Sequence, residues 1–177
     1  MNVIETKLKG CFIIEPKVFK DDRGYFFESF NQQNFEALTG QSGHFVQDNQ
    51  SASTYGVIRG LHFQKGEHAQ AKLVRAIEGA VLDVAVDIRE GSETYGEWVA
   101  VELTSENNRQ LYVPRGFAHG FSVLSNHAVF AYKCDNFYNK ASEGGIIYND
   151  PTLNIDWQVP SDKAILSEKD IALPSFR

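Results

Sequence analysis

The chain has 177 residues, which is enough for one domain with a complete hydrophobic core. Hydrophobic residues make up 42% and charged residues 23% of it, as in an ordinary globular protein. The formal net charge is −6 and no basic block occurs, so nucleic-acid binding is not indicated. We therefore expect a single domain that spans residues 1–177.

The sequence shows no targeting signal and no cysteine pattern typical of a disulfide framework or a metal site. The first ten residues, MNVIETKLKG, lack the apolar core of a signal peptide, and no run approaches the ~18 apolar residues of a membrane span. Cys11 and Cys134 form neither a disulfide framework nor the paired spacing of a metal site. Two reduced thiols are the simplest interpretation. These features predict a cytoplasmic protein without a membrane partner.

Short strand signals follow one another along the chain, separated by turns. Helix signals are few: 31–40 reads as a short helix with Asn31 as its cap and Gly40 after its end, and 167–175 as one turn before Pro174. This pattern predicts an all-β sandwich or small barrel, such as a jelly roll, with a few short helices. The expected strands are 10–19, 25–30, 57–64, 71–79, 80–89, 97–104, 109–114, 120–125 and 128–138.

Residues 80–89 show the clearest alternation. One face of this strand carries only apolar residues, and the other carries two aspartates. Asp83 and Asp87 fit the solvent face of an antiparallel sheet, or the polar interior of a barrel that holds a ligand. The apolar face is Ala80, Leu82, Val84, Val86 and Ile88, and the other is Val81, Asp83, Ala85 and Asp87.

Ionisable side chains occur in several of the predicted strands. If they point into one cavity, they suit an anionic substrate and proton transfer, because histidine titrates near neutral pH and tyrosine can donate a proton. Each could instead be a structural residue with a satisfied hydrogen bond, since sequence does not show convergence in space. The residues are Arg59, His62, Lys72, Asp83, His119 and Tyr132.

Metal and nucleophile chemistry is disfavoured by spacing. Residues 62–64 read His-Phe-Gln, so the His-x-His pair of a metal-binding barrel is missing, and His127 lies eight residues beyond His119. No G-x-S-x-G elbow, P-loop or G-x-G-x-x-G motif is present. The sequence therefore predicts no bound metal and no cofactor.

Nine segments follow one another in order from about residue 10 to 175: EPKVFKDDRGYFFESF, FVQDNQS, RGLHFQ, AKLVRAIEG, DVAVDIREGSETYGEW, VPRGFAHGF, AYKCDNFY, SEGGIIYNDP and LSEKD. Together they resemble the dTDP-4-dehydrorhamnose 3,5-epimerase family. The resemblance implies a cupin-like jelly roll, a homodimer and a metal-free site for a dTDP-sugar. It also implies inversion of C3 and C5 of dTDP-4-dehydro-6-deoxy-D-glucose, on the route to dTDP-L-rhamnose for surface polysaccharide.

The same resemblance assigns four catalytic roles. His62 matches the base that removes the C3 and C5 protons, and Asp170 matches the carboxylate that orients it. Tyr132 matches the acid that returns a proton on the opposite face of the sugar ring. Lys72 matches the cation beside the C4 oxygen, where enolate charge develops.

Twelve further positions match family contacts to the nucleotide or sugar, some of them made from the partner subunit. Arg59 and His119 suit the diphosphate, because arginine pairs with phosphate oxygens in bidentate fashion. Tyr138 matches a ring that stacks on thymine, and Phe26 is expected to line the same pocket. Asp83 is expected to support His119 or contact the sugar. The remaining positions are Arg23, Glu28, Gln47, Asp48, Asn49, Glu143 and Lys169.

Three alternatives stay open. A relative that epimerises only C3 or only C5 of another dTDP-deoxysugar would share the fold and most motifs. A binding module without catalysis would not need both His62 and Asp170. A metal cupin such as a dioxygenase is disfavoured by the missing His-x-His pair.

Arg59 and His62 pose a geometric question, because residues three apart on a flat strand point to opposite faces. If one binds the diphosphate and the other removes protons, both must reach the same cavity. Gly60 between them predicts a bulge or bend that re-aims one of the two side chains.

Overall fold

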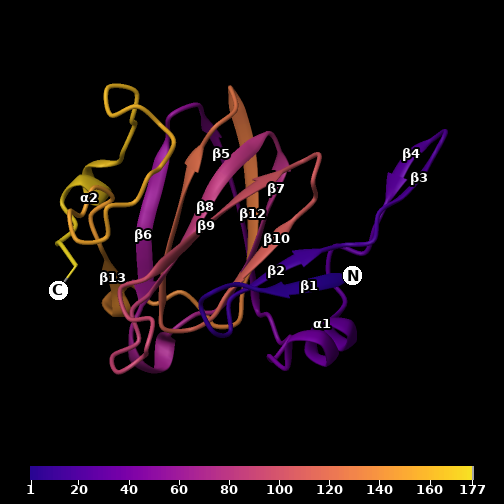
Figure 1. Cartoon of the computed structure of the whole chain (residues 1–177), viewed down its shortest axis with the longest axis horizontal. Helices are drawn as coiled ribbons and strands as arrows, with labels where there is room; N and C mark the ends of the chain where they lie inside the picture. Colours follow the sequence, from indigo (N-terminus) through magenta and orange to yellow (C-terminus); the bar gives the residue numbers. More distant parts are fainter. Residues whose placement is uncertain (177) are drawn as a thin grey trace.

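The computed structural model describes residues 1–176 and consists mainly of two antiparallel sheets that face each other (Figure 1). The first sheet has six strands in the order β1 (Asn2–Glu5), β2 (Phe12–Glu15), β10 (Gln110–Val113), β7 (Lys72–Glu78), β12 (His127–Cys134) and β5 (Gln47–Thr54). The second has five in the order β13 (Glu143–Gly145), β6 (Ile58–Gln64), β11 (Phe117–Val123), β8 (Ala80–Asp87) and β9 (Trp98–Thr104). This arrangement is a cupin-like jelly roll, as predicted.

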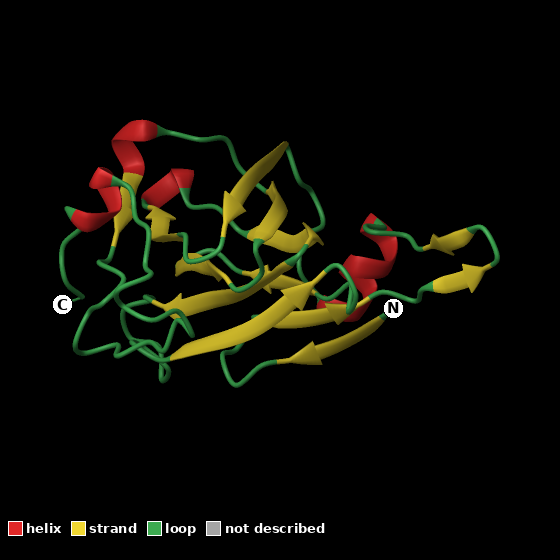
Figure 2. Cartoon of the chain, turned by 90° about the horizontal axis from the view of Figure 1, so that it is seen from above, coloured by secondary structure: helices red, strands yellow, loops and turns green. Residues whose placement is uncertain are grey.

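The other elements are short. A hairpin of β3 (Phe19–Asp21) and β4 (Gly24–Phe26) projects from the barrel, and the 3-10 turns are η1 (Gly66–His68) and η2 (Lys140–Ser142). Figure 2 shows helix α1 (Gln32–Thr39) near the hairpin, and α2 (Glu168–Ile171) lies on the opposite, C-terminal side in Figure 1. Within residues 1–176, no helix is both long and apolar enough to span a membrane.

Three apolar clusters hold the layers together. The central one fills the space between the sheets with side chains such as Val74, Leu103, Leu111 and Phe130. A second lies between the five-stranded sheet and the C-terminal segment, which adds Trp157, and a third packs α1 against the outer face of the six-stranded sheet. The five-stranded sheet is therefore covered on both faces.

The alternation predicted for residues 80–89 is confirmed. Leu82, Val84 and Val86 pack under the C-terminal segment, whereas Val81 and Ala85 face the core between the sheets. The aspartates on that inner face do not reach solvent, because the carboxylates of Asp83 and Asp87 are fully buried. Their interpretation as a solvent face is wrong, since the facing six-stranded sheet and the 88–96 loop cover them.

The helix predictions are confirmed as well. The Asn31 side chain accepts a hydrogen bond from the Asn34 amide, and Gly40 follows the helix in the left-handed conformation, with φ 66°. The second helix is a single turn that begins after Ser167. Both ends of α1 therefore match the signals in the sequence.

Several strand boundaries differ from those predicted. The predicted strand 25–30 stops at Phe26, and 128–138 stops at Cys134 because the chain turns into a loop there. Segment 10–19 divides into β2 and the start of β3. Strands β1, β5 and β13 were not expected; β5 reads QDNQSAST, which lacks the apolar alternation that marks a strand.

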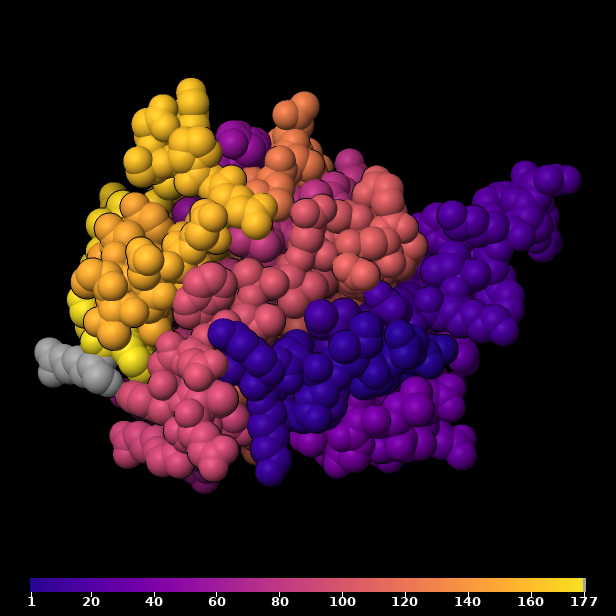
Figure 3. Space-filling model, viewed as in Figure 1, coloured from indigo at the N-terminus to yellow at the C-terminus, as the bar shows by residue number. Residues whose placement is uncertain are grey.

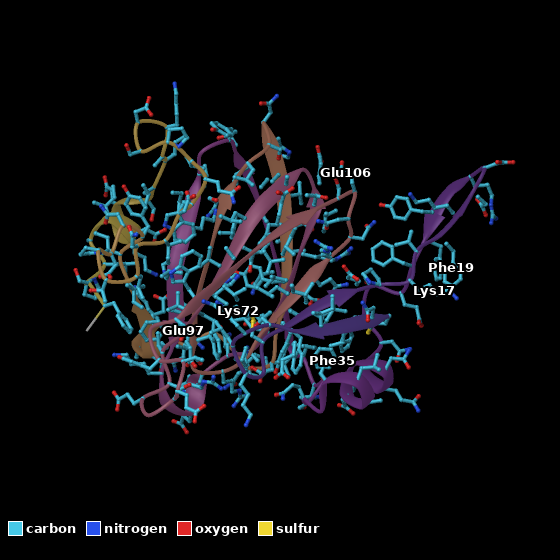
Figure 4. The ribbon with its side chains drawn as sticks, viewed as in Figure 1. Lys17, Phe19, Phe35, Lys72, Glu97 and Glu106 are labelled. Carbon is cyan, nitrogen blue, oxygen red and sulfur yellow. The ribbon has the colours of Figure 1, made fainter. Side chains whose placement is uncertain are left out.

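The projecting hairpin exposes large apolar side chains. Phe19, Tyr25 and Phe26 are 54%, 62% and 66% exposed. Figure 3 shows the hairpin standing clear of the rest of the molecule, and Figure 4 places Phe19 and Lys17 at its base. The ammonium of Lys17 lies 5.0 Å from the centre of the Phe19 ring. Such a surface is unusual for an isolated chain.

Candidate active site

A cavity of about 720 Å³ lies between the two sheets. Its walls come from both sheets, from the loop after β12 and from α2, so it gathers residues that are distant in sequence. Eleven of the sixteen expected site residues line it. They are Gln47, Asn49, Arg59, His62, Lys72, His119, Tyr132, Tyr138, Glu143, Lys169 and Asp170.

His62 and Asp170 form a close pair in this cavity. The Nε2 atom of His62 lies 2.9 Å from Oδ1 of Asp170, and only 6% of the Asp170 side chain is exposed. Asp170 belongs to α2, whose Ser167 cap accepts a hydrogen bond from the Asp170 amide. With a proton on the nitrogen that faces the carboxylate, the other ring nitrogen keeps its lone pair.

The pKa of His62 is lower than usual, chiefly because the ring is buried. The Asp170 carboxylate opposes this effect, whereas the ammonium groups of Lys72 and Lys169 add to it. His62 is therefore neutral at pH 7 and able to accept a proton. A neutral imidazole held by a carboxylate is the arrangement of a general base.

Tyr132 enters the cavity from the opposite sheet. It lies on β12 of the six-stranded sheet, whereas His62 lies on β6 of the five-stranded sheet. Burial raises the pKa of Tyr132, so its phenol stays protonated at neutral pH. The cavity thus has a proton acceptor on one wall and a proton donor on the facing wall.

Lys72 lies on the same sheet as Tyr132, and its ammonium is 5.9 Å from the centre of the Tyr132 ring. Burial lowers the pKa of Lys72, while the carboxylates of Asp83 and Glu143 oppose this shift. Figure 4 shows Lys72 inside the outline of the barrel, well away from the hairpin. Its position allows it to interact with negative charge in the cavity.

His119 and Asp83 form a second buried pair in the five-stranded sheet. Nε2 of His119 lies 3.0 Å and 2.9 Å from the two carboxylate oxygens of Asp83. Phe130 stacks beside the His119 ring at 6.3 Å. Asp83 contacts the His119 ring and is not among the residues that line the cavity.

A third set of charges lies near the His62–Asp170 pair. Nζ of Lys169 is 2.8 Å from both oxygens of Glu143. This ion pair lowers the pKa of Glu143, and the Tyr138 hydroxyl also bonds to that carboxylate. Strand β13, which carries Glu143, and helix α2, which carries Lys169 and Asp170, are therefore joined beside His62.

The bulge predicted at Gly60 is present. On β11, Phe121 comes two positions after His119, while on β6 their partners Arg59 and His62 are three positions apart. The extra residue lets both Arg59 and His62 reach the cavity. Gly60 has φ 126°, and the peptide bond between Gly60 and Leu61 is cis.

Gly60→Ala is expected to lower the free energy of unfolding by about 2–5 kcal/mol, because strain from positive φ and overpacking add together. A Cβ atom there would lie 2.6 Å from Cα of Gly120 and 2.8 Å from the His119 carbonyl oxygen. Urea unfolding measures the effect. Gly24→Ala is the matched control: φ is 129°, but no atom lies within 4 Å. Equal losses in the two variants would contradict the steric argument.

Five expected residues do not line the cavity of this chain, and Asp83, which contacts His119, is one of them. Asp48 faces the other side of β5 from Gln47 and Asn49, where it pairs with Lys133 at 2.9 Å. The remaining three lie in or just after the projecting hairpin. They are Arg23, Phe26 and Glu28.

The cavity also contains residues that were not expected. Gln64 and Gln70 line it, and so does Ser51, whose buried hydroxyl has no hydrogen-bond partner among residues 1–176. The sequence did contain a signal for Gln64, because a glutamine at the end of the largely apolar strand segment VIRGLHFQ could have indicated a buried polar role. Across the same described residues, no group of three or more His, Cys, Asp or Glu side chains could hold a metal ion.

The chain is similar along its whole length to known epimerases. The family model described as dTDP-4-dehydrorhamnose 3,5-epimerase matches residues 5–177. A protein of that name from Shigella flexneri is 56% identical over 171 residues, which covers 97% of this chain and 93% of the relative.

Solved structures agree. The crystal structure of dTDP-4-dehydrorhamnose 3,5-epimerase from Elizabethkingia anophelis NUHP1 has a TM-score of 0.96 and 63% identity, over 99% of this chain and 96% of that one. The dTDP-6-deoxy-D-glucose-3,5-epimerase of Legionella pneumophila, in complex with dTDP-4-keto-L-rhamnose, has a TM-score of 0.93 and 49% identity, over 99% and 98% of the two chains. The chain belongs to the dTDP-4-dehydrorhamnose 3,5-epimerase family.

Proposed function

We propose that this protein is a dTDP-4-dehydrorhamnose 3,5-epimerase, an isomerase of dTDP-L-rhamnose biosynthesis. Its substrate is a dTDP-linked 4-dehydro-6-deoxy sugar, as in the Legionella complex. The observation that carries this proposal is the pair of proton-transfer groups on facing walls of one cavity, His62 with Asp170 on one side and Tyr132 on the other.

Proton removal is assigned to His62. The C4 carbonyl of the substrate acidifies the protons on C3 and C5, and neutral His62 accepts one of them. The electron pair of the broken C–H bond forms a double bond to C4, and the electron pair of the C4 carbonyl moves to its oxygen, which becomes negatively charged. The ammonium of Lys72, which lines the cavity, stabilises this enolate.

Proton return is assigned to Tyr132. Inversion requires that the new proton arrive on the face opposite to the one that lost it. The Tyr132 phenol, held protonated by burial, donates from the six-stranded sheet. Proton exchange with water then restores the phenol and the neutral imidazole, and the same sequence at the second carbon completes the reaction.

Nucleotide binding is assigned to the remaining polar residues of the cavity. Arg59 and His119 suit the diphosphate, and Asp83 orients His119. Tyr138, which is 54% exposed at the rim, offers a ring on which thymine can stack. Gln47, Asn49, Glu143 and Lys169 complete the lining around the sugar nucleotide.

The functional unit is proposed to be a homodimer. The projecting hairpin exposes Phe19, Tyr25 and Phe26, and a second copy of the chain would cover them. Arg23, Phe26 and Glu28 would then contact the substrate from the partner subunit. Sedimentation analysis is expected to give the mass of two chains, and Phe26→Asp to shift it toward one. A monomeric wild-type protein would contradict this part of the proposal.

Proton exchange tests the activity directly. The protein is incubated with dTDP-4-dehydro-6-deoxy-D-glucose in D₂O, and C3 and C5 are followed by NMR. Deuterium at both carbons, together with a product that a reductase specific for the L-lyxo sugar accepts, is expected. Deuterium at one carbon alone would indicate a single-position epimerase. Absence of exchange with the nucleotide still bound would leave only a binding module.

Lys169→Met is expected to raise the pKa of His62. The change removes an ammonium that disfavours the imidazolium ion and frees the Glu143 carboxylate, which favours it. Catalysis needs neutral His62, so the fall of kcat/KM on acidification should begin at a higher pH than in the wild type. The exposed Lys163→Met serves as the control. An unchanged profile, or an acidic shift, would contradict the assignment.

A further inference from the structure

Gln64 is buried at the edge of the cavity, on the same strand as His62 and two residues beyond it. Its amide forms three hydrogen bonds, all to backbone atoms. Nε2 donates to the carbonyl oxygens of His68 at 2.6 Å and Phe137 at 3.2 Å, and Oε1 accepts from the amide of Asn139 at 2.7 Å. The N–H donor of Asn139 and the two carbonyl acceptors fix which amide atom points which way.

Two of these bonds hold residues 135–142, which we call the Tyr138 loop. They bind backbone atoms on either side of Tyr138, at Phe137 and Asn139. The amide of Tyr138 itself is bound by Oε1 of Gln47 at 3.2 Å. The rim position of the Tyr138 ring therefore depends on backbone anchors as well as on the bond between its hydroxyl and the Glu143 carboxylate, because its side chain is more than half exposed.

Other amide side chains strengthen the same loop. Gln70 donates to the carbonyl of Asn136 at 2.7 Å, and Asn136 donates to the carbonyl of Glu67 at 2.8 Å. Of these amides, Gln64 alone lies on the strand that carries His62. Its side chain therefore links the strand that carries His62 to the loop.

We infer that Gln64 is a positioning residue that sets the affinity for the nucleoside part of the substrate by holding Tyr138. This inference rests on the proposed function, in which thymine stacks on Tyr138. Loss of the Gln64 amide leaves two carbonyls and one N–H without partners, so the loop would rearrange to solvate them. The ring would then lose its fixed place beside the cavity.

The test compares dTDP affinity, measured by calorimetry, with the rate of C3 and C5 exchange at saturating substrate. Gln64→Met, which keeps the length of the side chain, is expected to weaken dTDP binding roughly tenfold, within the range of one base–aromatic stack. The saturated exchange rate should change less than about twofold, because the His62–Asp170 pair is not altered.

A double variant separates this role from a general loss of stability. If Gln64 acts through Tyr138, adding Gln64→Met to Tyr138→Ala should weaken dTDP binding no further than Tyr138→Ala alone. Thr39→Val is the matched control, because it removes a buried side-chain bond to a backbone carbonyl in α1, remote from the cavity. It should leave dTDP affinity unchanged.

Gln64→Glu is the second variant if Gln64→Met does not fold. It keeps the acceptor for the Asn139 amide and loses both donors, so the same loss of dTDP affinity is expected. Unchanged affinity in the Gln64 variants, additive losses in the double variant, or an equal fall in the saturated rate would overturn the inference. If the wild-type protein fails to bind dTDP, both this inference and the proposed function are overturned.

Discussion

His62→Ala is expected to reduce deuterium incorporation at both C3 and C5 by roughly 10³- to 10⁴-fold, the upper part of the range for general acid–base catalysis. The variant retains the cavity, the residues proposed to bind the diphosphate and Tyr132, but the proposed base is missing. Binding of dTDP should be largely preserved, because the lost ring is assigned to the sugar end of the site. NMR in D₂O measures the exchange, and calorimetry measures the binding.

The controls for this variant follow from the geometry. Asp170→Asn keeps His62 but removes the carboxylate that lies 2.9 Å from its ring, so an intermediate loss of exchange is expected. His127→Ala changes a histidine that is outside the cavity lining and pairs with Glu78 on the surface, and it should exchange at the wild-type rate. Normal exchange in His62→Ala would remove His62 from the mechanism.

Alternation in the sequence predicted the composition of each strand face but not what covers it. In β8, Leu82 and Val84 share one face and Val81 and Ala85 the other, as the period-2 pattern required. Asp83 on the inner face could equally have met solvent. Its burial depends on His119 and on the facing sheet, which the local sequence of β8 does not encode.

The bulge at Gly60 was predictable for a different reason. Two side chains with related chemistry, three residues apart, can serve one cavity only if the strand gains a residue, and a glycine stood between them. Strand β5 gave no such signal. Its residues are mostly polar and half exposed, and its strand conformation follows from pairing with β12 along its full length.

The pairing of His62 with Asp170 could not come from local pattern. The region of Asp170 predicts one helical turn, and nothing in that turn indicates that it packs beside β6. The nine ordered motifs supplied the pairing by resemblance, and the 2.9 Å contact is consistent with it. The three hydrogen bonds from the Gln64 side chain to backbone atoms could not be predicted from local sequence either, because their partners lie in two separate loops.

Tyr132→Phe is expected to separate proton removal from inversion. The variant keeps the ring that packs 6.1 Å from Phe130 and loses only the hydroxyl. His62 can still remove protons, so deuterium should enter from the His62 side of the sugar. Return from the opposite face then depends on water, and product formation should fall roughly 10²- to 10³-fold, as for loss of a general acid.

The informative quantity is the ratio of deuterium exchange to product formed, followed in one NMR sample. This ratio should rise in Tyr132→Phe and stay at the wild-type value in Tyr55→Phe, whose tyrosine lies outside the cavity lining. A parallel fall of both rates would mean that Tyr132 serves binding or proton removal instead. Because His62 and Tyr132 enter from facing sheets, an unchanged rate of inversion would require another donor on the six-stranded side, where Lys72 and Ser51 also line the cavity.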